Sequence, residues 1–300
     1  MLGYLHQRYA ESFSAVGAAR ELLQCRGWIL ERRIPGSAYR DAMGCYPRFL
    51  CQDWSRLHID LQDIGNELVC LSLVTDPFGD YTPSYLSNCF DLVRPFKEHY
   101  VVDLCKPKDL LGSKHHRRFA RKGLARAQIE LCSDPSQFIN EWDDLWHHLV
   151  NRHHIRGIRA FSKPAFAKQL TVPGTVLFRA THQGKLIGLH WYYEHGEVVY
   201  AHLAALAPDC YQLATSYALH WCAIEHFTGR SHWLDLGAGA GVDTDGTDGL
   251  SEFKRGWSTG TRVSFFCGRV FAPREYLRIV TAAGIGATAY FPAYRDGEFG

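Results

Sequence analysis

The stretch HWLDLGAGAGVD, residues 232–243, decides the fold. It passes from apolar residues through an aspartate into alternating glycines, which is how the ligand-holding turn of a dinucleotide or S-adenosylmethionine site begins. Such a turn opens a helix, because the N–H groups at the helix N-terminus hold the ligand. Here more turn formers follow from residue 242, and only about 60 residues remain for the further strands and helices of a methyltransferase. A methyltransferase is therefore disfavoured.

The composition is that of an ordinary globular protein. With 300 residues, 46% of them hydrophobic and 21% charged, the chain can bury one large or two medium cores. A formal net charge of +2 predicts no strong attraction of the whole molecule to nucleic acid, so a basic site has to be local. The start, MLGYLHQRYAES, has no leader pattern, and no run approaches the roughly 20 apolar residues of a membrane span. We therefore expect a cytoplasmic protein without a membrane span.

The cysteines and acidic turns predict no metal site. Ten cysteines are scattered singly, without a CxxC pair, which favours reduced thiols over a disulfide framework or a zinc site. Asp243, Asp245 and Asp248 lack the 12-residue spacing and the closing glutamate of an EF-hand, so a solvated turn is the better interpretation.

The residues before the glycine turn predict a β-β-β-α-β order. Strands are expected at 176–180, 186–193 and 197–204, separated by short glycine-bearing turns, which makes an antiparallel meander. Apolar residues then recur at helical spacing between Pro208 and Gly229, and a strand follows at 232–236. Because a helical crossover makes two strands parallel neighbours, the glycines come at the carboxyl end of the last strand, where ligands approach open α/β sheets.

The rest of the chain gives weaker patterns. Helices are expected from about residue 136 to 150 and from Ser162, with apolar residues on one face. In the first hundred residues, a helix is predicted over 5–16 and strands over 28–34, 47–54 and 67–76.

This order, closed by a late strand at 262–271, resembles a GNAT acyltransferase domain. More specifically, residues 103–257 are similar to the FemABX-like, or acetyltransferase 6, branch of that superfamily. The segments that carry the resemblance are DLLGSKHHRRFARKGL at 109–124, HLAALAPDCYQLATSYALHWCAIEHF at 202–227, and WLDLGAGAG with DGLSEFKRGW within 233–257. The resemblance implies an α/β (α+β) fold of tandem GNAT-like domains, each a mixed, mostly antiparallel sheet flanked by helices. The first copy, 1–124, would be degenerate, and the second, 125–300, would carry the acyl-transfer site.

Three residues are candidates for the chemistry of acyl transfer, which needs a stabilised oxyanion and a proton acceptor. Lys254, beside Phe253, is predicted to face the carbonyl oxygen, and the resemblance implies the same role; the alternative is a surface lysine. Asp235 could orient Lys254, accept a proton, or cap the glycine turn. His202, on a strand expected to border the acyl group, is a second candidate proton acceptor or a packed histidine.

A basic segment is the other informative feature. From residue 103 to 126 there are eight Lys or Arg and two Asp, and Ser113 is expected to cap a helix there. The predicted phosphate-binding or tRNA-binding residues are Lys114, Arg117, Arg118, Arg121 and Lys122. Four of them recur at helical spacing on one face, where like charges repel unless an anion lies opposite. The alternative is a solvated helix face.

The acyl donor is the open point. Coenzyme A users of this superfamily normally present Gln/Arg-x-x-Gly-x-Gly/Ala before the crossover helix, but PDCYQLATSY at 208–217 contains no glycine. Several FemABX members instead take aminoacyl groups from aminoacyl-tRNA, whose phosphates a basic helix can hold. The resemblance assigns the donor contacts to Tyr211, Gln212, Ala214, Ser216, Gly237 and Gly239.

The sequence thus predicts transfer of an aminoacyl or acyl group to an amino or hydroxyl acceptor, such as a small molecule or a cell-envelope precursor. Aminoacyl-tRNA is the expected donor, and no tightly bound cofactor is expected. One alternative is an acyl-CoA-dependent N-acetyltransferase of polysaccharide or small-metabolite biosynthesis, and another is a non-catalytic module that binds an anion or RNA. The spatial expectation is that 232–236 runs beside the third meander strand, with a gap for the acyl tail near Lys254.

Overall fold

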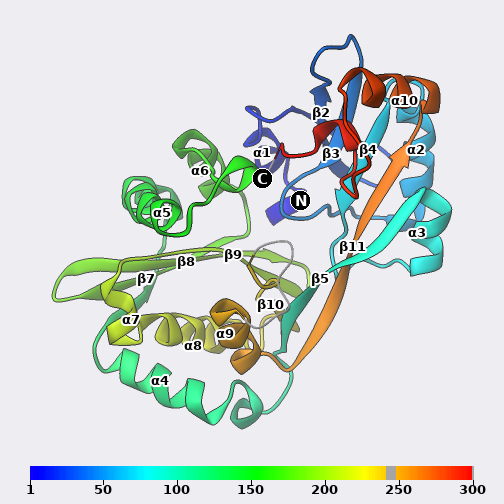
Figure 1. Cartoon of the computed structure of the whole chain (residues 1–300). Helices are drawn as coiled ribbons and strands as arrows, with labels where there is room; N and C mark the ends of the chain where they lie inside the picture. Colours follow the sequence, from blue (N-terminus) through cyan, green and yellow to red (C-terminus); the bar gives the residue numbers. More distant parts are fainter. Residues whose placement is uncertain (241–247, 299–300) are drawn as a thin grey trace.

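The computed structural model describes residues 1–240 and 248–298, and within them eleven strands form one continuous sheet (Figure 1). The strands are β1 Ala18–Leu22, β2 Gly27–Arg33, β3 Arg40–Gly44, β4 Cys70–Val74, β5 Leu92–Asp103, β6 Gln128–Leu131, β7 Thr175–His182, β8 Lys185–His195, β9 Val198–Leu206, β10 Trp233–Asp235 and β11 Gly260–Val270. Their order in the sheet is β1-β2-β3-β4-β11-β5-β10-β9-β8-β7-β6. The protein is therefore of the mixed α/β class, with a mostly antiparallel sheet, as the sequence predicted.

Helices cover both faces of this sheet. They are α1 Gln7–Glu11, α2 Leu57–Ile64, α3 Pro83–Cys89, α4 Lys114–Leu124, α5 Ile139–His153, α6 Lys163–Leu170, α7 Asp209–Leu213, α8 Thr215–Phe227, α9 Gly249–Trp257 and α10 Pro273–Ala282. Beside the meander, α5 and α6 lie on one side, and α4, α7, α8 and α9 lie on the other (Figure 1). None of the described helices combines the length and apolarity that a bilayer span needs.

The β-β-β-α-β order of the second half is confirmed. Strands β7, β8 and β9 pair antiparallel, α8 crosses over, and β10 returns parallel to β9. The right-handed crossover packs α8 onto the sheet, where Leu219, Ala223 and Phe227 are fully buried.

The first half repeats this order and is tied to the second through exchanged strands. Strands β1, β2 and β3 pair antiparallel, and β4 returns parallel to β3 after α2. In each half, the fourth strand then pairs antiparallel with a strand from the other part of the chain: β4 with β11, and β10 with β5. The long pairing of β5 with β11 lies at the centre of the sheet, between these two pairs. The repeated order supports the tandem arrangement, which stays a prediction.

The domain boundary at residue 124 also stays a prediction, and the structure shows what lies on each side of it. Helix α4, before this boundary, packs on the second half, where a Cβ at Gly123 would lie 2.5 Å from the Ala214 carbonyl oxygen. The chain end returns to the first half, where Arg295 donates to Asp41 over 2.5 Å. Neither half is a continuous stretch of sequence.

The expected strand over 47–54 was wrong. Residues 48–51 are buried, but only Phe49 forms an isolated bridge, to Thr75, and the third strand is β3 instead. A short run of buried residues has no strand periodicity, and Pro47 has no N–H to donate to a ladder. The expected helix over 5–16 is shorter, because α1 covers only Gln7–Glu11 after a 3-10 turn at Gly3–Leu5.

A buried ion pair joins the two halves where β10 ends. The Arg48 guanidinium, from the segment after β3, donates to an Asp235 carboxylate oxygen. Their side chains are 4% and 0% exposed. The Arg48 guanidinium carbon also lies 5.4 Å and 4.9 Å from the ring centres of Tyr4 and Tyr200. Because neither charge reaches water, each depends on the other.

Removing one partner of this pair is expected to destabilise the protein strongly. Arg48→Met or Asp235→Asn leaves the remaining charge buried without its counter-charge, at a cost of about 3–5 kcal/mol of unfolding free energy. The double variant removes both charges, so its loss is expected to fall short of the sum by at least about 1 kcal/mol. Urea denaturation at pH 7 measures this coupling.

The exposed pair of Lys108 and Glu225 is the matched control, with an expected coupling below about 1 kcal/mol.

Burial raises the pKa of Asp235, but the charge of Arg48 and the His99 contact outweigh it and hold the pKa well below its usual range. The stabilisation is therefore present above the unfolded-state pKa, about 4, and is lost as the pH falls through the folded-state value. If the losses of unfolding free energy in Arg48→Met and Asp235→Asn simply added up in the double variant, the account would be contradicted.

Candidate active site

Strands β9 and β10 separate at Asp235. They pair in parallel over three positions, the last being Asp235 with Tyr200. The chain then leaves β9, because Leu236 N donates to Tyr100 O over 2.9 Å and Tyr100 N donates to Gly237 O over 3.1 Å. Within the described residues, the β10-facing edge of β9 from 201 to 206 has no strand partner. Such an edge offers free N–H and C=O groups to an extended ligand.

Lys254 points from α9 to the turn after β10. Its Nζ donates to the Ala238 carbonyl oxygen over 2.7 Å. Gly237 adopts a φ of +76°, which a residue with a side chain rarely does, and a Cβ there would lie 3.3 Å from Nζ. The backbone conformation and the nearby ammonium therefore both favour glycine at this position. Burial lowers the pKa of Lys254 to about 8, opposed by the Asp235 carboxylate and assisted by the Arg48 guanidinium. A half-buried ammonium of this kind is not an ordinary surface lysine.

Asp235 caps the glycine turn. Its Oδ1 accepts from Gly237 N over 2.7 Å, and both carboxylate oxygens lie 3.0–3.1 Å from His99 Nδ1. Burial lowers the pKa of His99, so its neutral ring donates to Asp235. No ion pair joins Asp235 to Lys254 in the described chain. A carboxylate held by three donors is a weak proton acceptor, so the catalytic role of Asp235 stays a prediction while its capping role is visible.

Asp76 is a second buried carboxylate beside Arg48. Tyr200 donates its hydroxyl to Asp76 Oδ2 over 2.8 Å, whereas Oδ1 is buried and has no hydrogen-bond partner. Burial raises the pKa of Asp76 to about 6, against the lowering effects of Arg48 and Tyr200. Its charge therefore changes close to neutral pH.

His202 lies on the α1 and α6 side of the sheet. Its Nδ1 lies 3.0 Å from the Tyr4 hydroxyl, and its Nε2 lies 3.3 Å from Gln169 Oε1. Burial holds the pKa of His202 well below its usual value, and the Arg48 charge lowers it further. Both ring nitrogens are thus occupied in a neutral ring, which favours packing over proton transfer; its catalytic role stays a prediction.

Four of the predicted donor-binding residues lie around the start of α8. Tyr211 is exposed beneath the Arg152 guanidinium, 4.6 Å from its ring centre, and the Gln212 carbonyl accepts from Arg126 over 3.2 Å. Ala214 is buried in a left-handed conformation, and α8 begins after it without a side-chain cap. Ser216 lies in the first turn of α8, and the half-buried Gly239 follows β10, as Gly237 does; contact of all six residues with a donor stays a prediction.

The basic helix is α4, and it packs against α8. Its buried side is made by His116, Ala120 and Gly123. Four of the predicted phosphate-binding residues are exposed: Lys114, Arg118, Arg121 and Lys122. Arg117 differs, because its guanidinium donates to backbone carbonyls, among them Gly112 O at 2.7 Å. Nη1 of Arg117 therefore holds the preceding turn, and anion binding by all five residues stays a prediction.

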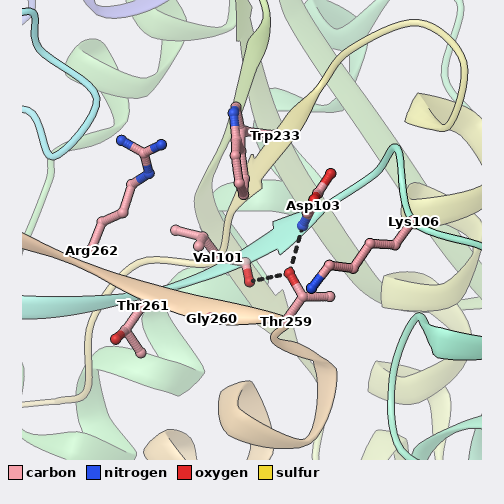
Figure 2. Close-up of a pocket in the computed structure, with 8 residues that line it drawn as sticks. All are labelled: Val101, Asp103, Lys106, Trp233, Thr259, Gly260, Thr261 and Arg262. Carbon is pink, nitrogen blue, oxygen red and sulfur yellow. Dashed lines mark hydrogen bonds between the residues drawn. The ribbon is translucent and has the colours of Figure 1, made fainter.

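A pocket of about 310 Å³ lies on the Asp235 face of the sheet (Figure 2). Its floor is Val101, which pairs with both Asp235 and Gly260, and Trp233 shares the face because it lies two residues before Asp235. The remaining lining residues are Asp103, Lys106, Thr259, Thr261 and Arg262. The Arg262 guanidinium carbon lies 4.9 Å from the Trp233 ring centre, which gives the pocket a cationic and aromatic wall.

Sequence reasoning missed the residues that the first half brings to this site. Arg48, Asp76 and His99 lie far from Asp235 in the chain, and no local spacing connects them. The only feature of the sequence that could have pointed to Arg48 was the position of this arginine inside the apolar run PRFLC. Asp243 and Asp245 lie outside the described residues, whereas Asp248 caps α9 by accepting from Leu250 N and Ser251 N.

Comparisons with known proteins show what the chain is similar to. Residues 112–255 match the Acetyltransferase (GNAT) domain. The structure is similar to FemX, with a TM-score of 0.67, 13% identity, and 91% of this chain and 93% of that chain covered. It is also similar to the C-terminal domain of a protein described as a lysylphosphatidylglycerol synthetase from Agrobacterium fabrum, with a TM-score of 0.59, 13% identity, and 83% and 84% covered.

A third similar structure is L-PGS from Bacillus licheniformis, with a TM-score of 0.56, 11% identity, and 89% and 93% of the two chains covered. No curated protein matches the sequence significantly. The glycine turn lies within a segment similar to an acetyltransferase domain, which favours acyl transfer over a methyltransferase. Residues 112–255 are therefore similar to an acetyltransferase (GNAT) domain, and the chain shares the fold of FemX.

Proposed function

We propose that the protein transfers an aminoacyl group from aminoacyl-tRNA to an amino or hydroxyl group of its acceptor, with Lys254 stabilising the oxyanion. The observation that carries this proposal is the position of Lys254. Its ammonium lies where β10 leaves β9, and the free edge of β9 begins one residue beyond the last paired position. An acyl group held along that edge would bring its carbonyl oxygen to a positive charge in a site of low dielectric.

The transfer follows from ester chemistry. The nitrogen or oxygen of the acceptor attacks the carbonyl carbon of the ester, and negative charge develops on the carbonyl oxygen, where the Lys254 ammonium stabilises it. The bond to the tRNA oxygen then breaks, this oxygen takes a proton, and the acceptor loses one to a base. Each removed donor of an oxyanion site typically costs 10²–10³-fold in rate, so Lys254 alone would supply about 3–4 kcal/mol.

Asp76 is the better of the two carboxylates for the proton. A general base works best when its pKa lies near the working pH, and that of Asp76 is raised to about 6. Asp235 is held ionised by Arg48 and His99 and so would accept a proton poorly. We therefore assign Asp235 to positioning the turn, and Asp76 to accepting the proton directly or through water.

The donor assignment rests on α4 and on the segment before α8. The exposed cations of α4 lie on a helix in contact with that segment, because Gly123 touches the Ala214 carbonyl. Segment 208–217 offers no glycine turn for a pyrophosphate. Sugar-phosphate backbone is the anion that a row of exposed basic residues holds without reading its sequence. The cytoplasm, where charged tRNA is found, is the proposed location.

The pocket beside Trp233 is the proposed entry for the acceptor. It lies on the same sheet face as Asp235 and His99, and its lining carries two cations, Lys106 and Arg262, against one carboxylate, Asp103. A polar acceptor with an anionic group suits this lining, as a small molecule or a cell-envelope precursor would.

Replacement of Lys254 is the direct test of the mechanism. Lys254→Met is expected to lower kcat by at least about 100-fold while the Kd of the donor changes little, because the ammonium acts in the transition state. The pH profile of kcat/KM is expected to rise through about 6 as Asp76 ionises and to fall through about 8 as Lys254 loses its proton. Lys254→Arg is expected to move the falling limb to higher pH.

Lys185, exposed at the start of β8, supplies the control: Lys185→Met is expected to leave both limbs unchanged. The mechanism would be refuted by a Lys254→Met enzyme with wild-type kcat, or by a falling limb that stays near 8 in that variant.

The donor is identified by supplying labelled aminoacyl-tRNA and labelled acetyl-CoA separately, with simple amine and alcohol acceptors. Label is expected to move from tRNA in a ribonuclease-sensitive reaction. Arg118→Gln, Arg121→Gln and Lys122→Gln together are expected to weaken tRNA binding at least tenfold and to reduce its salt dependence by about three charges. The control set, Arg56→Gln, Lys185→Gln and Arg274→Gln, removes the same charge elsewhere and is expected to change little. Ribonuclease-insensitive transfer from acetyl-CoA would overturn the tRNA assignment.

A further inference from the structure

We propose that Asp103, Cys105 and His232 form a binding site for a divalent transition-metal ion, best suited to Zn²⁺, where β5 ends and β10 begins. Asp103 is the last residue of β5, Cys105 lies in the turn that follows, and His232 directly precedes β10. Their ligand atoms all lie within 4.8 Å of one another. This proposal does not rest on the proposed acyl transfer: Cys105 and His232 have no part in it, and Asp103 only lines the pocket proposed for the acceptor.

The backbone fixes the three residues relative to one another. Asp103 pairs with Trp233 in the β5–β10 ladder, and Leu104 N donates to the His232 carbonyl over 2.8 Å. Asp103 N in turn donates to Thr259 Oγ1 over 2.7 Å, and Cys105 N donates to Asp103 Oδ1 over 3.1 Å. The site is therefore carried by two paired strands, so little backbone order has to be created when a metal binds.

The side chains are close to the separation that zinc requires. His232 Nε2 lies 3.5 Å from Asp103 Oδ1. Ligand atoms at about 2.0–2.3 Å from a tetrahedral Zn²⁺ lie about 3.3–3.7 Å from each other, so this pair already fits. The thiol of Cys105 lies within 4.8 Å of both partners, so it has to approach by at most about 1 Å, which an exposed side chain can do by small rotations.

The donor set selects the kind of metal. Imidazole and thiolate favour Zn²⁺ and related ions over Mg²⁺ and Ca²⁺, which take oxygen ligands. One thiolate and one carboxylate balance the two positive charges of the ion. The bound complex is therefore itself neutral, beside the cations of the neighbouring pocket. Figure 2 shows the Asp103 carboxylate turned away from the Lys106 ammonium, so this lysine does not compete with a metal ion for the carboxylate. Three protein ligands leave the fourth position to water.

Cys105 is distinguished from the other cysteines by its exposure. Eight of the ten are buried, Cys222 is half-buried, and Cys105 alone is exposed. The buried thiols fill the cores, whereas an exposed thiol beside an imidazole and a carboxylate can take a metal from solvent. The sequence predicted no metal site because His232 lies far from the other two ligands in the chain. A bound ion would clamp β5 to β10, the strands through which the two halves meet.

The test is zinc binding by the full-length protein. Calorimetry is expected to give one tight Zn²⁺ per chain and a higher Tm with Zn²⁺ bound. Co²⁺, as a spectroscopic substitute, is expected to show a thiolate charge-transfer band. Cys105→Ser and His232→Gln are each expected to weaken zinc binding at least tenfold, and Cys105→Ser is expected to remove the band. Both variants are expected to fold as the wild type does without metal, which circular dichroism and Tm in a chelator check.

Adventitious binding needs its own controls, because the chain contains 16 histidines. His153→Gln with His154→Gln removes an exposed histidine pair at the end of α5, and Cys222→Ser removes the half-buried thiol. Both controls are expected to bind Zn²⁺ as the wild type does. The proposal is overturned if Cys105→Ser and His232→Gln keep wild-type affinity, or if the control variants lose it. Acyl transfer plays no part in these readouts, so failure of one proposal leaves the other standing.

Discussion

The site depends on the buried contact between Arg48 and Asp235. Water cannot screen either charge, so the contact forms only when the first half of the chain delivers Arg48 to the end of β10. Once paired, Asp235 also accepts from Gly237 N and His99, and these bonds set where β10 stops and how the glycine turn leaves it. The carbonyl that receives Lys254 belongs to the next residue of this turn. An interaction between the two halves thus positions the ammonium in the second.

Strand exchange at the centre of the sheet explains how this contact is held. Because β11 lies between β4 and β5, neither half can close its own sheet without a strand from the other part of the chain. The ends of β10 and of β5 are fixed in the same ladder, so Asp235, His99 and the pocket beside Trp233 share one rigid frame. Preorganisation of this kind is what electrostatic stabilisation of an oxyanion requires, because the charges need no rearrangement during the reaction.

Local patterns in the sequence predicted the second half well and the first half only in part, where β2 and β4 were expected but the strand over 47–54 was wrong. The meander and the crossover helix follow from period-two and helical spacing and from short glycine turns, all of which act over a few residues. Lys254 was singled out by its neighbour Phe253 and by the resemblance. The insertion of β11 beside β4 and the arrival of Arg48 at Asp235 depend on pairing between distant segments, which leaves no local signature. Arg117 shows the same limit: its helical position did not indicate that its Nη1 donates to the carbonyls of the preceding turn.

The central claim is that the Lys254 ammonium faces the acyl-donor path with a lowered pKa, and trace acetylation of the native protein with acetic anhydride across pH tests it most directly. Mass spectrometry of the Lys254 peptide then reports its reactivity at each pH. The account predicts a half-point near 8 and protection by saturating aminoacyl-tRNA. A half-point near the ordinary lysine value of about 10.4, or reactivity that the donor leaves unchanged, would contradict it.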